Sequence, residues 1–312
     1  MRIAVTGASG FLGTPLVRRL RAGGHDVVRF VRGPSTAADE RSWDPATRTL
    51  DPQSLADVDA VVHLAGAGVG DKRWSAKRKA EVLRSRVDGT SAVAQAVAAS
   101  DRTRVLLSAS GVGYYGDTGD RLTDETGPLG EGFLAEVCRQ WEGATAPAEA
   151  AGARVVHLRS GIVLGPGGGA LGPQLPVFRA FLGAPLGSGR QWVPWISLHD
   201  ELEAMVHLLD ADVSGPVNLV APAPVTNRQF TKALGRAVHR PTLPIPVPGF
   251  VLRALLGEFA DEAVLIGQHV EPAVLERTGF RFTHRDVDSA LAAAVAKSDG
   301  SDLHQPPAGV GA

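Results

Sequence analysis

The residues with the clearest capacity for chemistry are three glycines near the start of the chain. Gly7, Gly10 and Gly13 follow one another at a spacing of three. A glycine-rich turn presents backbone N–H groups with no Cβ to hold a ligand away, and such groups bind phosphate oxygens at close range. We therefore predict that this loop binds the diphosphate of a dinucleotide. The predicted binding residues are Gly7, Ser9, Gly10, Phe11, Leu12 and Gly13.

The elements on either side of the glycines support this prediction. Residues 2–6 are apolar and partly β-branched, which is typical of a buried strand, and residues 11–22 form an amphipathic run typical of a helix. A strand, a glycine turn and a helix in that order open a dinucleotide-binding βαβ unit. The helix also adds the partial positive charge of its N-terminus.

The next two predicted strands add further cofactor contacts. Residues 25–31 read as the second strand, and Arg32 follows where an NAD-specific unit carries an acidic residue for the ribose 2′-hydroxyl. An arginine instead pairs with a 2′-phosphate, so we expect NADP(H) to be preferred over NAD(H); the alternative is a solvated surface arginine. After the strand at residues 58–65, we expect Leu64, Ala65 and Gly66 to approach the cofactor.

Polar side chains follow the next predicted strand, residues 104–109. Ser110, Tyr114 and Tyr115 lie at its carboxyl end, where open α/β sheets bind ligands. They are the candidate catalytic residues. The candidate substrate residues are Trp74, Arg159, Arg190 and Trp195. Two of these have structural alternatives, because Arg159 could pair with a nearby carboxylate and Trp195 could pack at a domain junction.

The order of elements predicts an α/β fold, a Rossmann-like doubly wound parallel sheet, with a smaller, mostly helical C-terminal substrate lobe. The predicted helices include residues 80–99 and 131–150, and residues 153–164 are a predicted strand. We expect residues 1–165 to form the NADP(H)-binding domain, with about 190–220 returning to it. Residues 166–297 would form the substrate lobe and C-terminal helical domain, and 298–312 a disordered tail.

Composition narrows the class of protein. The net charge of -1 over 312 residues gives no electrostatic case for binding nucleic acid or a membrane surface. The single cysteine, Cys138, fits a reducing compartment, and there is neither a signal segment nor an apolar run long enough to span a bilayer, so we expect a cytoplasmic protein. No cluster has metal-ligand spacing, so we predict no metal.

Several segments together resemble the extended short-chain dehydrogenase/reductases, which include nucleotide-sugar epimerases and dehydratases. The segments are 6–13, 63–66, 110–117 and 193–200. Segments 113–117, 132–142 and 159–165 resemble more closely an atypical branch labelled "epimerase family". Segments 246–249, 257–258 and 279–282 are similar to the C-terminal domain of unknown function that this branch carries. The resemblance implies a nicotinamide cofactor and a small-molecule substrate, and by analogy a homodimer through the helices at 80–99 and 131–150.

The catalytic pattern of those enzymes is missing from this chain. They use a Tyr-x-x-x-Lys pair, in which the lysine lowers the tyrosine pKa and holds the nicotinamide ribose. Counting from Glu142, the tyrosine position falls at Leu134 and the lysine position at Cys138, and the chain contains no Tyr-x-x-x-Lys pair. Tyr114 or Tyr115 with Ser110 is the best replacement. The alternatives for either role are Asp117, Glu131 and Glu136.

Two functions therefore stay open. The first is an NADP(H)-dependent oxidoreductase or epimerase-like enzyme with a non-standard acid/base, acting on a small polar metabolite for which a nucleotide sugar is one candidate. The second is a non-catalytic NADP(H)-binding regulatory or redox-sensing protein. A nucleophilic role for Cys138 is a third idea, against which stands the usual burial of free cysteine.

Overall fold

The computed structural model describes residues 1–301, with side chains as far as Ala296. At its centre is a seven-stranded sheet in the order β10-β6-β5-β4-β1-β2-β3, in which every neighbouring pair is parallel. The strands are β1 (Arg2–Thr6), β2 (Asp26–Arg32), β3 (Glu40–Trp43), β4 (Ala60–His63), β5 (Val105–Gly111), β6 (Arg154–Ser160) and β10 (Gly215–Leu219). The predicted doubly wound parallel sheet is confirmed.

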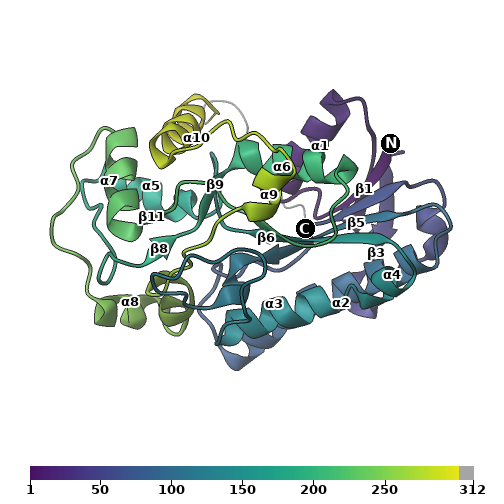
Figure 1. The fold of residues 1–312 in the computed structure, drawn as a ribbon, viewed down its shortest axis with the longest axis horizontal. Helices are drawn as coiled ribbons and strands as arrows, with labels where there is room; N and C mark the ends of the chain where they lie inside the picture. Colours follow the sequence, from purple (N-terminus) through teal and green to yellow (C-terminus); the bar gives the residue numbers. More distant parts are fainter. Residues whose placement is uncertain (302–312) are drawn as a thin grey trace.

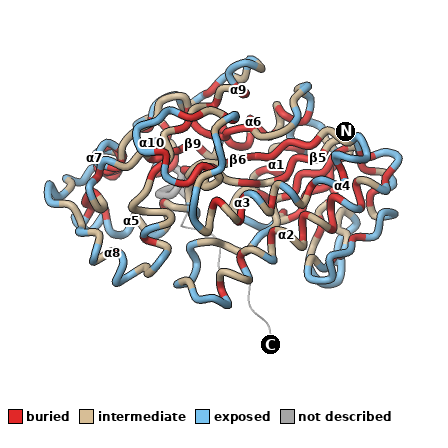
Figure 2. Tube along the Cα trace, turned by 60° about the horizontal axis from the view of Figure 1, so that its bottom comes forward, coloured by how far each residue is buried: buried red, intermediate tan, exposed pale blue. Residues whose placement is uncertain are grey.

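Helices cover both faces of this sheet (Figure 1). One face carries α1 (Gly13–Ala22) and α6 (Leu198–Asp210), and the other carries α2 (Ala76–Ala98), α3 (Phe133–Gly143) and α4 (Ala146–Ala150). Successive residues of each strand point to opposite faces, so Val5 packs with α1 while its neighbour Ala4 packs with α2. Burial is therefore concentrated along the strands (Figure 2). The strand order reverses between β1 and β4, where such sheets bind ligands.

The rest of the chain forms a smaller, mostly helical lobe at one end of the sheet (Figure 1). Its helices are α5 (Leu171–Arg179), α7 (Asn227–Ala237), α8 (Gly249–Leu256) and α10 (Val287–Ser301), which packs against α7. The short helix α9 (Ala273–Arg277) packs against β10 of the main sheet. Its two short strand pairs are β7 (Ile162–Leu164) with β9 (Trp195–Ser197), and β8 (Trp192–Val193) with β11 (Val225–Thr226). Single helical turns are η1 (Pro45–Thr47), η2 (Pro52–Leu55), η3 (Val112–Tyr115) and the π-helical η4 (Ala260–Val264).

Three elements differ from the sequence predictions. The predicted helix at 131–150 is two helices, α3 and α4, which are separated at residues 144–145. The predicted strand at 153–164 divides at Gly161, where a Cβ would lie 2.3 Å from the Pro194 carbonyl oxygen, and β7 leaves the main sheet to pair with β9. Residues 298–301 continue α10 rather than beginning a tail, and residues 302–312 lie outside the described part of the chain. The boundary at 165/166 stays a prediction.

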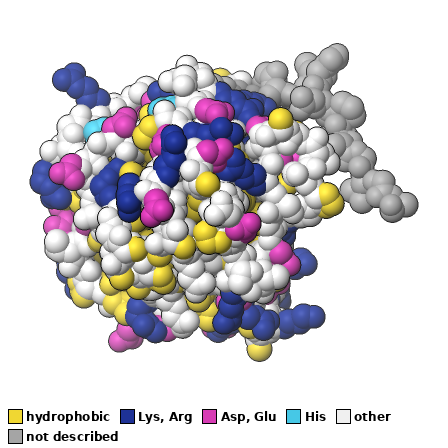
Figure 3. Space-filling view, turned by 90° about the vertical axis from the view of Figure 1, so that its right-hand side faces the viewer, with side chains coloured by type: hydrophobic (Ala, Val, Ile, Leu, Met, Phe, Trp, Pro, Cys, Tyr) yellow, Lys and Arg dark blue, Asp and Glu magenta, His cyan; other side chains and the backbone are white. Residues whose placement is uncertain are grey.

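Two observations concern the surface. Within residues 1–301, no helix is both long and apolar enough to cross a membrane. At the end of the molecule opposite the C-terminal lobe, basic and acidic side chains are interspersed (Figure 3). This view shows no surface dominated by one sign of charge.

Candidate functional site

The glycine loop has the geometry of a phosphate cradle. Gly7 has a φ of +67°, and the Gly10 N–H donates to the Gly7 carbonyl at 2.9 Å. A Cβ on Gly13 would lie 2.0 Å from the Gly7 carbonyl oxygen, so only glycine lets α1 start this close to β1. Leu12, the N-cap residue of α1, makes no side-chain cap hydrogen bond, and the first turn of the helix has no acidic residue. Its N-terminal N–H groups are thus free of a competing carboxylate, which suits an anion.

The residues between the glycines have different exposures. Ser9 and Gly10 are exposed at the rim of the loop, whereas Phe11 and Leu12 are half-buried. The Phe11 ring packs towards the loop that follows β7, because a Cβ on Gly168 would lie 2.7 Å from the ring. Phe11 therefore joins the glycine loop to the C-terminal lobe, and Ser9 and Gly10 are the residues open to a ligand.

The end of β4 lies directly against this loop. The Thr6 hydroxyl oxygen lies 2.7 Å from Nδ1 of the buried His63 and accepts hydrogen bonds from the Leu64 and Ala65 N–H groups at 3.1 and 3.3 Å. A Cβ on Gly7 would lie 2.9 Å from the Leu64 carbonyl carbon. The structure thus brings the predicted segment Leu64–Gly66 next to the predicted loop. Burial lowers the pKa of His63 to about 4, so the imidazole is neutral at neutral pH.

Arg32 ends β2 and is exposed. It forms no hydrogen bond or ion pair with any residue that the structure describes. The nearby arginines on the same edge of the sheet are engaged, since Arg29 pairs with Asp39 at 2.7 Å and Arg41 with Asp57 at 2.8 Å. Arg32 therefore keeps all its donors for a ligand such as a 2′-phosphate.

The predicted catalytic residues Ser110 and Tyr115 are committed to a buried network. The Ser110 hydroxyl donates to Glu142 Oε1 at 2.7 Å. The Tyr115 hydroxyl donates to Asn218 Oδ1 at 2.7 Å and accepts from Arg159 Nη1 at 2.9 Å. Tyr115 is only 1% exposed, and burial raises its pKa to about 12. In this structure the Tyr115 hydroxyl is occupied by Asn218 and Arg159, and the Ser110 hydroxyl by Glu142 rather than by a tyrosine. This geometry does not favour proton transfer by Tyr115, and the catalytic roles of both residues stay predictions.

Tyr114 differs from its neighbour. It is half-buried, its ring lies 3.5 Å from the Arg159 guanidinium carbon, and no residue in the described chain bonds its hydroxyl. Of the three predicted catalytic residues, only Tyr114 keeps a free polar atom.

The positions that would carry the tyrosine and lysine are both apolar in character. Leu134 packs on Gly113, and the buried Cys138 thiol donates to the Gly111 carbonyl at 3.5 Å. Burial raises the pKa of the thiol to about 11, which makes a thiolate nucleophile unfavourable. The alternative acids are on the surface or engaged. Asp117 and Glu131 are exposed, and Arg139 and Gln140 bond the Glu136 carboxylate and hold its pKa at about 2.

The four predicted substrate residues are not brought together. Trp74 is half-buried and packs edge-on against Phe133 and Phe259, with ring centroids at 5.0 and 5.5 Å, and Arg190 is exposed on a loop. Arg159 is bonded to Glu142, as its alternative reading allowed. Trp195 is only 1% exposed, donates to the Ala223 carbonyl and packs in the core of the C-terminal lobe, which favours the structural alternative; its role in substrate binding stays a prediction.

Two residues near the site were missed from the sequence. Glu262, on η4, accepts from the Leu134 N–H at 3.3 Å, so the C-terminal lobe places a carboxylate at the start of α3. Arg86 is buried in α2, although it ends a basic stretch of the sequence, residues 72–86, of the kind that usually forms a solvated helix face. The spacing of the sequence indicates this burial, because Arg86 follows Val82 by four residues and falls on the face of the helix that carries Val93 and Val97.

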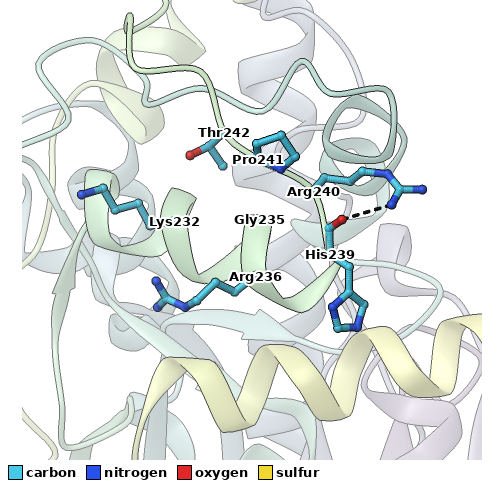
Figure 4. A pocket seen from close by; sticks show the side chains of 7 residues that line it. All are labelled: Lys232, Gly235, Arg236, His239, Arg240, Pro241 and Thr242. Atoms are coloured by element: carbon cyan, nitrogen blue, oxygen red, sulfur yellow. Dashed lines mark hydrogen bonds between the residues drawn. The ribbon is translucent and has the colours of Figure 1, made fainter.

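A surface hollow of about 600 Å³ lies elsewhere, at the C-terminal end of α7 (Figure 4). It is lined by Lys232, Gly235, Arg236, His239, Arg240, Pro241 and Thr242. None of these belongs to the glycine loop, and Arg236 pairs with Asp288 at 2.7 Å. The hollow is shallow and contains no residue of the dinucleotide cradle, so the candidate site is defined by the cradle instead. Among the described residues, no group of His, Cys, Asp or Glu is arranged to hold a metal ion.

Comparison with known proteins identifies the family of this chain. Residues 3–220 match the model of the NAD dependent epimerase/dehydratase family, and residues 247–294 match a domain of unknown function, DUF1731. The chain belongs to the NAD-dependent epimerase/dehydratase family. The predicted resemblance, including the domain of unknown function at the C-terminal end, is confirmed.

Relatives of the family align over nearly the whole chain. An epimerase family protein of Mycobacterium bovis is 48% identical over 290 residues, which are 93% of this chain and 96% of that protein. The crystal structure of human epimerase family protein SDR39U1 (isoform 2) with NADPH has a TM-score of 0.86 and 34% identity, covering 95% of this chain and 99% of that one. A nucleoside-diphosphate sugar epimerase from Corynebacterium glutamicum has a TM-score of 0.79 and 34% identity, covering 95% of this chain and 58% of that one.

Proposed function

We propose that this epimerase-family chain is an NADP(H)-dependent oxidoreductase or epimerase-like enzyme acting on a small polar metabolite of the nucleotide-sugar class. Its acid/base group is not a Tyr-x-x-x-Lys pair. The observation that carries the proposal is the glycine cradle together with the unpaired Arg32 at the end of β2. The cradle accepts a diphosphate at a helix N-terminus, and Arg32 supplies a bidentate donor for a 2′-phosphate.

The relatives support both the proposed cofactor and the proposed substrate class. The human family member was crystallised with NADPH, which matches the cofactor that Arg32 favours. The Corynebacterium relative is named as a nucleoside-diphosphate sugar epimerase, which favours a nucleotide sugar as the substrate. In this chain, the half-buried Trp74 and the exposed Arg190 are the proposed contacts for a sugar and a diphosphate, and Tyr114 is the proposed proton donor.

Titration of the purified protein with NADPH and NADH, followed by nicotinamide fluorescence, tests the cofactor. We expect NADPH to bind more tightly, and Arg32→Met to lower NADPH affinity about tenfold to a hundredfold with little effect on NADH, as loss of a charge-assisted hydrogen bond would. Arg18→Met, which removes another exposed arginine from α1, is the matched control. Binding of neither cofactor, or a preference for NADH, would refute the cofactor proposal.

A non-catalytic NADP(H)-binding regulator is the second candidate. The burial of Tyr115 and the bond between Ser110 and Glu142 favour it, because they remove two expected catalytic groups from the ligand. A panel of UDP-sugars incubated with NADP+ and the protein separates the two functions. Reduction of NADP+, or interconversion of the sugars, that Tyr114→Phe abolishes would exclude the regulator.

A homodimer and a cytoplasmic location stay predictions. The proposed dimer would use the helices α2 and α3, which lie side by side on one face of the sheet (Figure 1). Light scattering of the full chain, with and without NADPH, measures the oligomeric state directly.

A further inference from the structure

Arg86 is a positively charged side chain that is buried in the protein. It lies in the middle of α2, is 8% exposed, and shares its helix face with the buried Val82 and Val93. Its Nη1 donates to the Ala67 carbonyl at 2.9 Å and to the Val82 carbonyl at 3.1 Å. These bonds fix the guanidinium under the segment that follows β4.

The surroundings of Arg86 do not neutralise its charge. In residues 1–301 it has no ion pair, and its guanidinium carbon lies 4.8 Å from the centroid of the uncharged Trp141 ring. Arg78 nearby adds positive charge, and Asp71, whose carboxylate favours the charged form of Arg86, is largely exposed. Burial lowers the pKa of Arg86 to about 10, so the group is still protonated at neutral pH. A buried charge without an ionic partner is costly, and such a group is a candidate for binding a ligand.

Part of the guanidinium is open to such a ligand. Nε and Nη2 have no hydrogen-bond partner in the described chain, and they are not among the polar atoms that are sealed from solvent without a partner. They remain available as donors, and a guanidinium fork suits a pair of neighbouring oxygens.

The position of Arg86 identifies which part of a ligand it would meet. A Cβ on Gly66 would lie 3.6 Å from the guanidinium carbon, and Gly66 ends the segment that packs on the glycine loop. On its other side, Arg86 interacts electrostatically with Cys138, which occupies the position of the missing lysine on α3. Arg86 therefore lies between the diphosphate cradle and the helix that carries the lysine in the related enzymes.

We propose that Arg86 binds the nicotinamide ribose of NADP(H), in place of the lysine that is absent at Cys138. This inference rests on the proposed cofactor. The vicinal diol of the ribose offers two neighbouring oxygens, to which Nε and Nη2 can donate hydrogen bonds. In this role Arg86 holds the ribose in place and contributes positive charge, and it does not transfer a proton. Sequence comparison of helix α3 alone would miss it, because the group comes from α2.

Binding of three probes tests the assignment. NADPH contains the nicotinamide ribose, 2′-phospho-ADP keeps the diphosphate but lacks that ribose, and 2′,5′-ADP lacks both the second phosphate and the ribose. By calorimetry we expect Arg86→Met to weaken NADPH about tenfold to a hundredfold, the loss typical of a hydrogen bond to a charged group, and to leave the other two probes unchanged. Arg86→Lys should recover part of the NADPH affinity. Arg84→Met, on the exposed face of the same helix, is the control.

Every other outcome also counts for or against one of the two proposals, the ribose contact of Arg86 or the cofactor itself. Equal loss of NADPH and 2′-phospho-ADP assigns Arg86 to the diphosphate and overturns the ribose proposal, and so does unchanged NADPH affinity. Wild-type protein that binds none of the three probes refutes the proposed cofactor itself. If Arg86→Met does not fold, as absent 2′,5′-ADP binding would reveal, a crystal structure of the wild-type NADPH complex decides. A guanidinium nitrogen within about 3.5 Å of a ribose hydroxyl supports the proposal, and a separation above about 5 Å overturns it.

Discussion

Arg159 and Glu142 form a bidentate ion pair on the buried side of α3, with Nε–Oε1 and Nη2–Oε2 distances of 2.8 Å. The pair also organises the residues around it, because Glu142 accepts from Ser110 and Arg159 donates to Tyr115. Side chains that the sequence offered as catalytic are thereby joined into a single structural network.

Breaking this ion pair should be costly. Arg159→Met leaves the Glu142 carboxylate, whose side chain is 11% exposed, without its partner. We expect the free energy of unfolding, measured in urea, to fall by about 3–5 kcal/mol. Arg253→Met removes the exposed pair with Asp261 and should change it by less than about 1 kcal/mol. Equal losses in the two variants would contradict the structural role of the Arg159–Glu142 pair.

Tyr115 should behave as part of that network. Tyr115→Phe leaves Arg159 Nη1 and Asn218 Oδ1 short of a partner, so we expect a loss of about 1–3 kcal/mol in the free energy of unfolding. NADPH affinity should stay within about twofold of the wild type. Tyr114→Phe is the matched control and should unfold as the wild type does. Normal stability of Tyr115→Phe with a large loss of NADPH affinity would return Tyr115 to the ligand site.

The glycine cradle makes a steric prediction. The Cβ of Gly13→Ala would lie 2.0 Å from the Gly7 carbonyl oxygen, so α1 must move away from β1. We expect the free energy of unfolding to fall by about 1–3 kcal/mol and NADPH binding to weaken with it. Gly143→Ala, in α3, meets no atom within 4 Å and should be neutral or slightly stabilising. Unaltered NADPH affinity in Gly13→Ala would argue against the cradle.

Glu201 predicts a pH dependence of stability. Its side chain is fully buried, its Oε1 accepts from Ser160 at 2.6 Å, and burial raises its pKa to about 8. The folded state therefore binds a proton that the unfolded chain, with an ordinary glutamate pKa, releases as the pH rises from about 4.5. This contribution to stability is complete below that pH and is lost progressively up to about pH 8.

Glu201→Gln isolates the effect, because glutamine imitates the protonated carboxyl at every pH. Urea unfolding of both proteins between pH 5 and 9 should show the wild type losing stability relative to the variant by up to about 1.4 kcal/mol per pH unit, with no further divergence above the folded-state pKa. Parallel stability curves for the two proteins would contradict a raised pKa.

The sequence determined those features that depend on neighbouring residues. Gly7, Gly10 and Gly13 predicted the strand, turn and helix because backbone conformation and close approach are local requirements, and apolar runs predicted the buried parallel strands. Arg32 was correctly placed at the end of β2 for the same reason. The absence of a Tyr-x-x-x-Lys pair was also visible in the sequence alone.

Only the tertiary structure decided which polar side chains face a ligand. Tyr114 and Tyr115 are adjacent, yet Tyr115 is sealed by Arg159 and Asn218, which come from β6 and β10. Arg86 belongs to a basic run in the sequence but lies between β4 and α3 in the fold. The type of a residue determines what chemistry its side chain can perform. Its burial and its partners are set by elements far away in the chain, because packing of the sheet against its helices fixes the direction in which each side chain points.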